Sequence, residues 1–89
     1  MKLKKGFVLR EICGETVILG EGLDVVNFNK IIDLNETAAW IWREAERQKE
    51  FSVDGLTEAV CNEYEVEPET ARSDVNDILT NWKELGLLE

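Results

Sequence analysis

The 89-residue chain contains no histidine and only one proline and two cysteines. Without histidine it lacks the commonest general base, the commonest zinc ligand and the usual partner of a nucleophilic serine or cysteine. The paired carboxylates Glu67 and Glu69, and Asp74 and Asp77, belong to no Asp/Asn ladder with a central glycine, so they do not resemble a calcium loop. The sequence therefore predicts a protein that is not an enzyme and binds no metal or cofactor.

Cations are scarce in the second half of the chain. Residues 50–89 contain two, Arg72 and Lys83, against eleven carboxylates, whereas residues 1–49 contain eight charges of each sign. An acidic surface repels phosphate backbones, because nucleic-acid affinity comes largely from cations that displace condensed counterions. The charge distribution therefore disfavours nucleic acid as a partner.

The chain also lacks long apolar runs. No stretch approaches the roughly 20 residues that a membrane span requires, and the first residues do not resemble an export signal. In such a chain two cysteines, here Cys13 and Cys61, are more often reduced and buried than joined in a disulfide. We therefore expect a cytoplasmic protein with two buried thiols and no membrane partner.

The first third of the chain has the pattern of extended strands. Two apolar runs flank Gly14, at residues 7–13 and 16–19, and this arrangement predicts two antiparallel strands joined by a tight turn. From Val25 to Leu34 the even positions are apolar, with Lys30 as the exception, while Asn27, Asn29 and Asp33 at odd positions are polar, and this pattern predicts a third strand with one core face. We expect its ordered portion to be residues 29–34.

Helical periodicity begins after Leu34. Asn35 and Ser52 are suited to cap the starts of two helices, and Pro68 fits the first position of a third, where its missing N–H loses no hydrogen bond. Gly86 suits the left-handed end of that helix. The prediction is thus strands over about 7–34, helices over about 35–85, and one domain over residues 1–89. This is an α+β fold, a three-stranded antiparallel sheet followed by a three-helix winged helix-turn-helix-like bundle.

The predicted third helix has two unlike edges. Projected at about 100° per residue, its buried arc holds Ala71, Val75, Ile78, Trp82 and Leu85. One flank carries Arg72, Asn76, Leu79 and Lys83, and the other carries carboxylates that include Asp74 and Asp77. The first flank has two interpretations. It is either a solvent-exposed border, where the methylene groups of Arg72 and Lys83 cover apolar surface, or a binding surface in which Leu79 provides the apolar contact. The acidic start of the helix, residues 65–69, argues against a DNA recognition helix.

Residues 34–42, LNETAAWIW, resemble the L-N-x-[ST]-A-x-x-[IL]-[WL] signature of the PqqD-like family. The segment Leu85-Gly86-Leu87-Leu88 is similar to the family's L-x-x-x-G-L-[LI] ending, and the resemblance extends over about residues 7–88. It implies a non-catalytic peptide-recognition domain. Family members bind the leader segment of a ribosomally made precursor peptide and present the precursor to a modifying enzyme, often a radical S-adenosylmethionine enzyme.

The resemblance also implies where a leader would bind. The leader would add as a strand to the edge of the third strand, in a groove walled by the third helix, and an exposed edge offers unpaired N–H and C=O groups for this purpose. The expected peptide-binding residues belong to these two elements and are Asn29, Lys30, Ile31, Ile32, Asp33, Arg72, Asn76, Leu79 and Lys83.

Two other functions remain open on the sequence. The same edge could serve a protein–protein interaction or dimerisation module that regulates an enzyme, and a winged helix could bind nucleic acid. A free strand edge can pair with its own copy, so a monomer and a homodimer are both compatible with the sequence.

Overall fold

Three strands come first in the chain and three helices follow. The computed structural model describes residues 1–20 and 32–89. The elements are β1 (Phe7–Ile12), β2 (Glu15–Gly20), β3 (Ile32–Leu34), α1 (Glu36–Gln48), α2 (Val53–Glu63) and α3 (Pro68–Glu84). The predicted α+β class is confirmed, as is the order of a three-stranded antiparallel sheet and three helices. The predicted ordered part of the third strand is described only from Ile32 onward.

The β1–β2 hairpin is closed by the two residues Cys13 and Gly14. Their φ angles are 53° and 81°, and positive values at both central positions are what a type I′ hairpin turn requires. The predicted turn at Gly14 is therefore confirmed. Cys13 is exposed in this turn, so the expectation that it is buried is wrong, whereas both cysteines are free, as expected.

Local chemistry sets where the helices begin. The side chain of Asn35 accepts a hydrogen bond from the Ala38 N–H at 2.8 Å, and Ser52 accepts one from the Gly55 N–H at 2.9 Å. Each satisfies an N–H that has no partner within its helix. Pro68 is the first residue of α3. The three predicted helix starts are thus confirmed.

The end of α3 turns the chain back into the protein. Gly86 has a φ of 79°. The Leu87 N–H donates to the Trp82 carbonyl at 2.9 Å and the Gly86 N–H donates to the Lys83 carbonyl at 3.1 Å, which is the pattern of a Schellman cap. This cap directs Leu87 into the core, where its side chain is fully buried.

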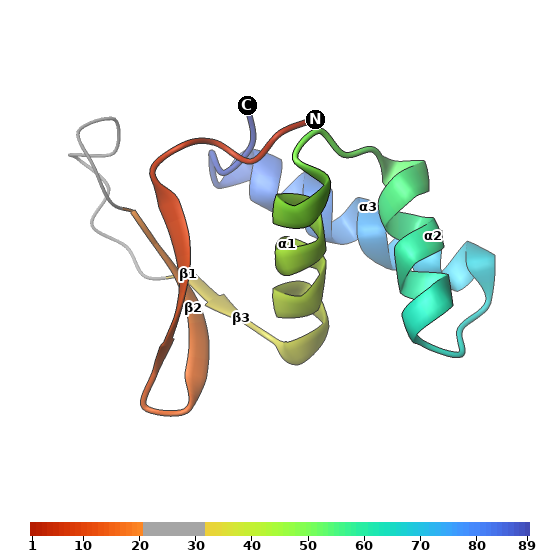
Figure 1. The fold of residues 1–89 in the computed structure, drawn as a ribbon, viewed down its shortest axis with the longest axis horizontal. Helices are drawn as coiled ribbons and strands as arrows, with labels where there is room; N and C mark the ends of the chain where they lie inside the picture. Colours follow the sequence, from red (N-terminus) through yellow and green to blue (C-terminus); the bar gives the residue numbers. More distant parts are fainter. Residues whose placement is uncertain (21–31) are drawn as a thin grey trace.

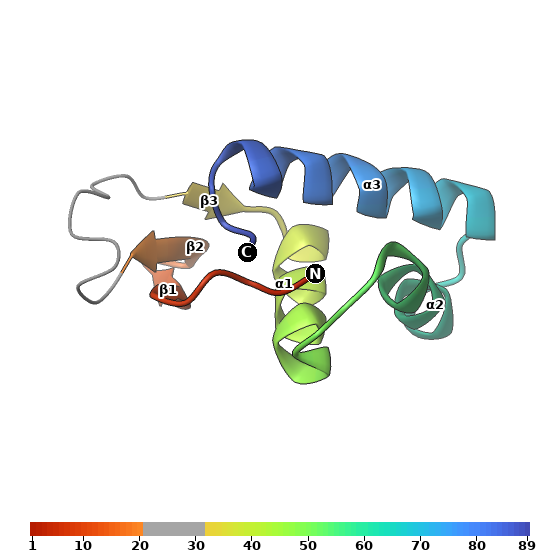
Figure 2. The ribbon, with the colours of Figure 1, turned by 90° about the horizontal axis from the view of Figure 1, so that it is seen from above.

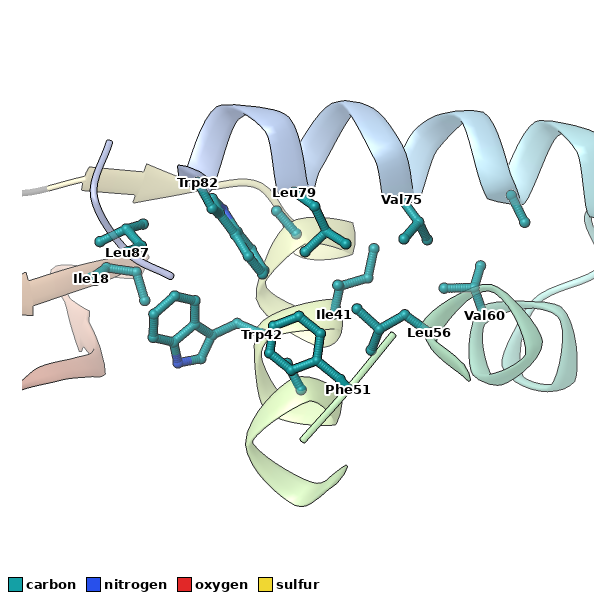
Figure 3. Close-up of a cluster of buried hydrophobic side chains, with 13 residues drawn as sticks. Ile18, Ile41, Trp42, Phe51, Leu56, Val60, Val75, Leu79, Trp82 and Leu87 are labelled. Carbon is teal, nitrogen blue, oxygen red and sulfur yellow. The ribbon is translucent and has the colours of Figure 1, made fainter. Parts of the chain in front are cut away.

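The core extends from the sheet into the space between the three helices (Figure 3). At its centre the rings of Trp42 and Trp82 meet edge to face, with centroids 5.1 Å apart, a geometry that aromatic pairs favour. Ile18 of β2 and Leu87 join the cluster from the side of the sheet. Figures 1 and 2 show α1 between the sheet and α2, while α3 runs past all three. One buried cluster therefore ties the sheet to all three helices.

The two ends of the chain lie side by side (Figure 1). The Lys4 N–H donates to the Leu87 carbonyl at 2.8 Å, and the Glu89 N–H donates to the Lys2 carbonyl at 2.8 Å. On the other side, Met1 exchanges two hydrogen bonds of 2.8 Å with Phe51. The first residues thus join the α1–α2 connection to the C-terminal segment. Within the described residues, no helix is long and apolar enough to span a membrane.

Candidate functional site

The register of the hairpin determines which way the backbone of β2 points. Ile12 and Glu15 are opposite each other next to the two-residue turn, so they form a pair that exchanges hydrogen bonds. Such pairs alternate with non-bonded pairs along an antiparallel ladder. The N–H and C=O groups of Thr16 and Ile18, which fall between bonded pairs, therefore point away from β1 and toward β3.

The same alternation fixes the outer edge of β3. Thr16 is opposite Leu34 and Ile18 is opposite Ile32, so Ile32 and Leu34 turn their backbone groups toward β2. The N–H and C=O of Asp33 then point to the other side. β3 is the last strand of the sheet, and in the part of the chain that the structure describes no hydrogen bond reaches Asp33 from that side. Among the described residues, the Asp33 N–H and C=O therefore have no hydrogen-bond partner.

A hollow of about 310 Å³ lies between the start of α1 and the middle of α3, and Asn35, the residue that directly follows β3, is part of its lining. In the view of Figure 2, β3 is drawn on the side of the sheet toward α3. The hollow is lined by Asn35, Thr37, Asp74, Asp77 and Ile78. This hollow, which begins directly after β3 in the sequence, is thus assembled from residues of α1 and α3 that are far apart in the sequence.

A second hollow, of about 630 Å³, lies between the hairpin turn, β3 and α1, and shares Asn35 with the first. Carboxylates of Glu11, Glu15 and Asp33 line it together with Arg43, whose guanidinium is 3.9 Å from Glu11. Among the described residues, no group of three or more side chains is arranged to hold a metal ion. Asp33 and Leu34 of β3 are part of the lining of this hollow.

The sequence of the chain matches a protein-family model along most of its length. The model is described as coenzyme PQQ synthesis protein D (PqqD), and it matches residues 15–88. The chain belongs to the PqqD family. The resemblance that residues 34–42 and 85–88 suggested is thereby confirmed.

Two solved structures share this PqqD-family fold. TbiB1 in complex with the TbiA(beta) leader peptide has a TM-score of 0.80 and 26% identity, with 100% of this chain and 95% of that chain covered. Lasso peptide synthetase B1 complexed with the leader peptide has a TM-score of 0.76 and 24% identity, with 99% and 95% covered. At 24% identity, the similarity to lasso peptide synthetase B1 is evidence for the fold alone. No curated protein matches the chain.

The family signature has a structural reason at nearly every position. Leu34 ends β3 and packs against the core, and Asn35 caps α1. Ala38 and Trp42 are buried on the inner face of α1. Thr37 is exposed and lines the hollow. The signature thus joins the open strand to the first helix and also forms one side of the hollow.

The predicted strand residues are only partly described. Asn29, Lys30 and Ile31 lie outside the described residues. The side chain of Ile32 is half-buried against the core, and Asp33 is exposed. Two of the five predicted edge residues are therefore placed on β3, and of these Asp33 has its backbone groups directed outward.

The predicted helix residues do not line the hollow. Leu79 is only 4% exposed and belongs to the core, so it cannot be an exposed apolar floor. Arg72 forms an ion pair with Asp54 of α2, with Nη2 and Oδ1 2.5 Å apart. Asn76 and Lys83 lie on the same edge of α3 as Arg72 by helical spacing. The ion pair places Arg72 beside α2, and the peptide-binding role expected for Asn76 and Lys83 stays a prediction.

The opposite edge of α3 faces the hollow. Asp74, Asp77 and Ile78 are there, and Leu85 follows on the same side by helical spacing, 39% exposed. Ile78 and Leu85, which the projection placed in the buried arc, are thus half-buried and exposed respectively. The sequence showed these carboxylates as a pair on one edge, but it held no signal for which edge of α3 meets β3.

Electrostatic perturbation is found away from the hollow. Arg47 donates hydrogen bonds to Glu44 on α1, which lower the pKa of Glu44, and the carboxylate in turn raises the pKa of Arg47. Gln48 also donates to Glu44, at 3.1 Å. This cluster strengthens the end of α1.

Proposed function

We propose that this protein binds the leader segment of a ribosomally made precursor peptide by strand addition to β3, and presents the precursor to a modifying enzyme. The protein itself is non-catalytic in this proposal and needs no cofactor. The observation that carries it is the outward backbone of Asp33 on the last strand of the sheet. The hollow of Asn35, Thr37, Asp74, Asp77 and Ile78 begins two residues further along the chain.

The similarity to TbiB1 supports a leader peptide as the bound chain. That structure contains a leader peptide, and the likeness extends over the whole of this chain at a TM-score of 0.80. The family resemblance suggests a radical S-adenosylmethionine enzyme, or another peptide-modifying enzyme, as the partner that receives the precursor.

Strand addition explains how one small domain can hold an extended peptide. Main-chain hydrogen bonds to the β3 edge provide affinity that depends little on the guest's sequence, and pockets for alternate side chains provide selectivity. Residues 29–33 form the proposed pairing edge. Side chains of Ile32 and Leu34 pack against the core on one face of the sheet. In a guest strand paired to β3, every second side chain points to that same face. Apolar guest side chains there would continue the apolar surface toward Ile78.

The proposed wall differs from the one expected from the sequence. The residues of α3 that border the hollow are Asp74, Asp77 and Ile78, and we assign the wall to them in place of Arg72, Asn76, Leu79 and Lys83. An acidic groove also disfavours the nucleic-acid alternative, because it repels phosphates.

A titration of the labelled protein tests the proposal. The probe is a set of synthetic 12-residue peptides selected from a randomised phage-display library on the immobilised protein. Amide resonances of residues 32–37 and 74–78 are expected to shift, while those of α2 stay in place. Shifts on α2 alone would contradict the proposal. Concentration-dependent shifts of residues 32–34 without peptide, together with a doubled mass, would instead favour dimerisation through β3.

A further inference from the structure

Two carboxylates on α3 border the hollow and have no cationic partner among the described residues. Asp74 and Asp77 are three residues apart on the same helix face, where side chains are neighbours at about 5–6 Å between Cβ atoms. Both are exposed and both line the hollow. Among residues 1–20 and 32–89 neither forms a salt bridge or a side-chain hydrogen bond. The groove thus holds two adjacent negative charges that the described part of the domain does not neutralise.

Several cations of the described chain are engaged elsewhere. Arg72 pairs with Asp54 on the α2 side of α3, Arg47 pairs with Glu44, and Arg43 lies near Glu11. No lysine or arginine is among the described residues that line the hollow. The described lining of the hollow therefore supplies no positive charge of its own.

The wall also has a place for the stem of a long side chain. Ile78 is half-buried beside Asp74 and Asp77 and lines the same hollow. Lysine and arginine place their methylene stems along apolar surface while the charged head stays near water or a counter-charge. An acidic guest side chain at this point would be repelled, and such repulsion contributes to specificity.

We infer that the guest peptide places a lysine or arginine side chain against Asp74 and Asp77, with its stem on Ile78. The groove therefore selects leaders with a basic residue next to the segment that pairs with β3. This inference rests on the proposed function and adds the chemical class of side chain that the site recognises.

The test uses the folded full-length protein and a randomised 12-residue phage-display library. Three proteins are compared: wild type, Asp74→Asn/Asp77→Asn, and the control Glu58→Gln/Glu63→Gln. The control removes two charges from exposed positions of α2, which lies on the side of α1 away from the sheet (Figure 2). Both double variants therefore have the same net charge, but only one changes the hollow.

Peptides selected on wild type and on the control are expected to share a lysine or arginine at one position. Binding of a selected peptide to Asp74→Asn/Asp77→Asn is expected to weaken about tenfold, as two partly exposed ion pairs would give. The control is expected to change it less than about twofold, and added salt should weaken the wild-type complex more than that of the Asn variant.

Two results would overturn the inference, and they differ in what they imply for the proposed function. If selected peptides shift residues 32–34 but show no basic position and bind the Asn variant as tightly as wild type, the inference fails and the proposed function stands. If no selected peptide shifts residues 32–34, both fail.

Discussion

The replacement of Asp33 by proline tests strand addition by removing one backbone N–H donor from the edge of β3. The register turns the Asp33 N–H away from β2 and toward the open edge. Proline lacks this N–H, and proline is tolerated in edge strands where the N–H does not belong to the ladder. Asp33→Pro should therefore remove a donor from the guest's hydrogen bonds and leave the β2–β3 pairing in place.

The expected loss of affinity follows from that donor. A typical hydrogen bond contributes about 0.5–1.5 kcal/mol, and leaving the guest's carbonyl unsatisfied in the groove costs about 1–3 kcal/mol. A net loss of about 2 kcal/mol corresponds to roughly a thirtyfold increase in Kd. The matched control is Asp33→Ala, which removes the carboxylate and keeps the N–H, and it should change Kd less than about threefold, as expected for an exposed charge.

Isothermal titration with one selected 12-residue peptide measures these affinities, and thermal unfolding by circular dichroism checks the fold of each variant. Equal Kd values for Asp33→Pro and Asp33→Ala, with both variants folded, would refute strand addition at this edge. A large loss of thermal stability in Asp33→Pro alone would instead show that the N–H belongs to the β2–β3 ladder and that the derived register is wrong.

Two further predictions concern stability. Leu87→Ala should lower the free energy of unfolding by about 3 kcal/mol, because the substitution leaves a cavity where a leucine side chain was buried. The control Leu85→Ala, at a 39% exposed position, should change it by less than about 1 kcal/mol. Equal losses for the two variants in urea unfolding would argue against the Schellman cap that buries Leu87. Glu44 has a lowered pKa in the folded protein through its hydrogen bond from Arg47, so its stabilising effect is present above the ordinary pKa and is lost as pH falls through the lowered value. Between about pH 7 and pH 3, the urea midpoint of wild type should fall more than that of Glu44→Gln, and parallel curves would contradict this role of Glu44.

Features set by local chemistry could be predicted from the sequence. Asn35, Ser52 and Pro68 identify helix starts because a cap depends on residues within one turn. Gly14 and Gly86 mark reversals that require a positive φ. The order of elements, and with it the fold class, follows from these local signals.

Features set by the packing of one element on another could not be predicted in this way. Ile78 and Leu79 are adjacent apolar residues, so the projection gave only the mean direction of the buried stripe, and the structure buries Leu79 and leaves Ile78 at the hollow. Which edge of α3 meets β3 depends on the side on which α2 packs, and the ion pair between Arg72 and Asp54 shows that side. Because these contacts between helices and strands join residues far apart in the sequence, no local sequence pattern predicts them.

The pairing of the chain ends was missed for the same reason. Lys2 is opposite Glu50 and Leu3 is opposite Leu88, yet the first residues show only a basic composition in the sequence. Such isolated bridges need no alternating apolar pattern, because they are held by backbone hydrogen bonds. They could be found only when the three segments were placed together.

Amide hydrogen exchange at Asp33 tests the central claim most directly. In the free protein the Asp33 N–H should exchange rapidly, while the N–H groups of Ile32 and Leu34, which point toward β2, exchange more slowly. Addition of a saturating selected peptide should slow exchange at Asp33 markedly and leave Ile32 and Leu34 nearly unchanged. An Asp33 amide that is already protected without peptide, or that exchanges equally fast in the complex, would contradict the account.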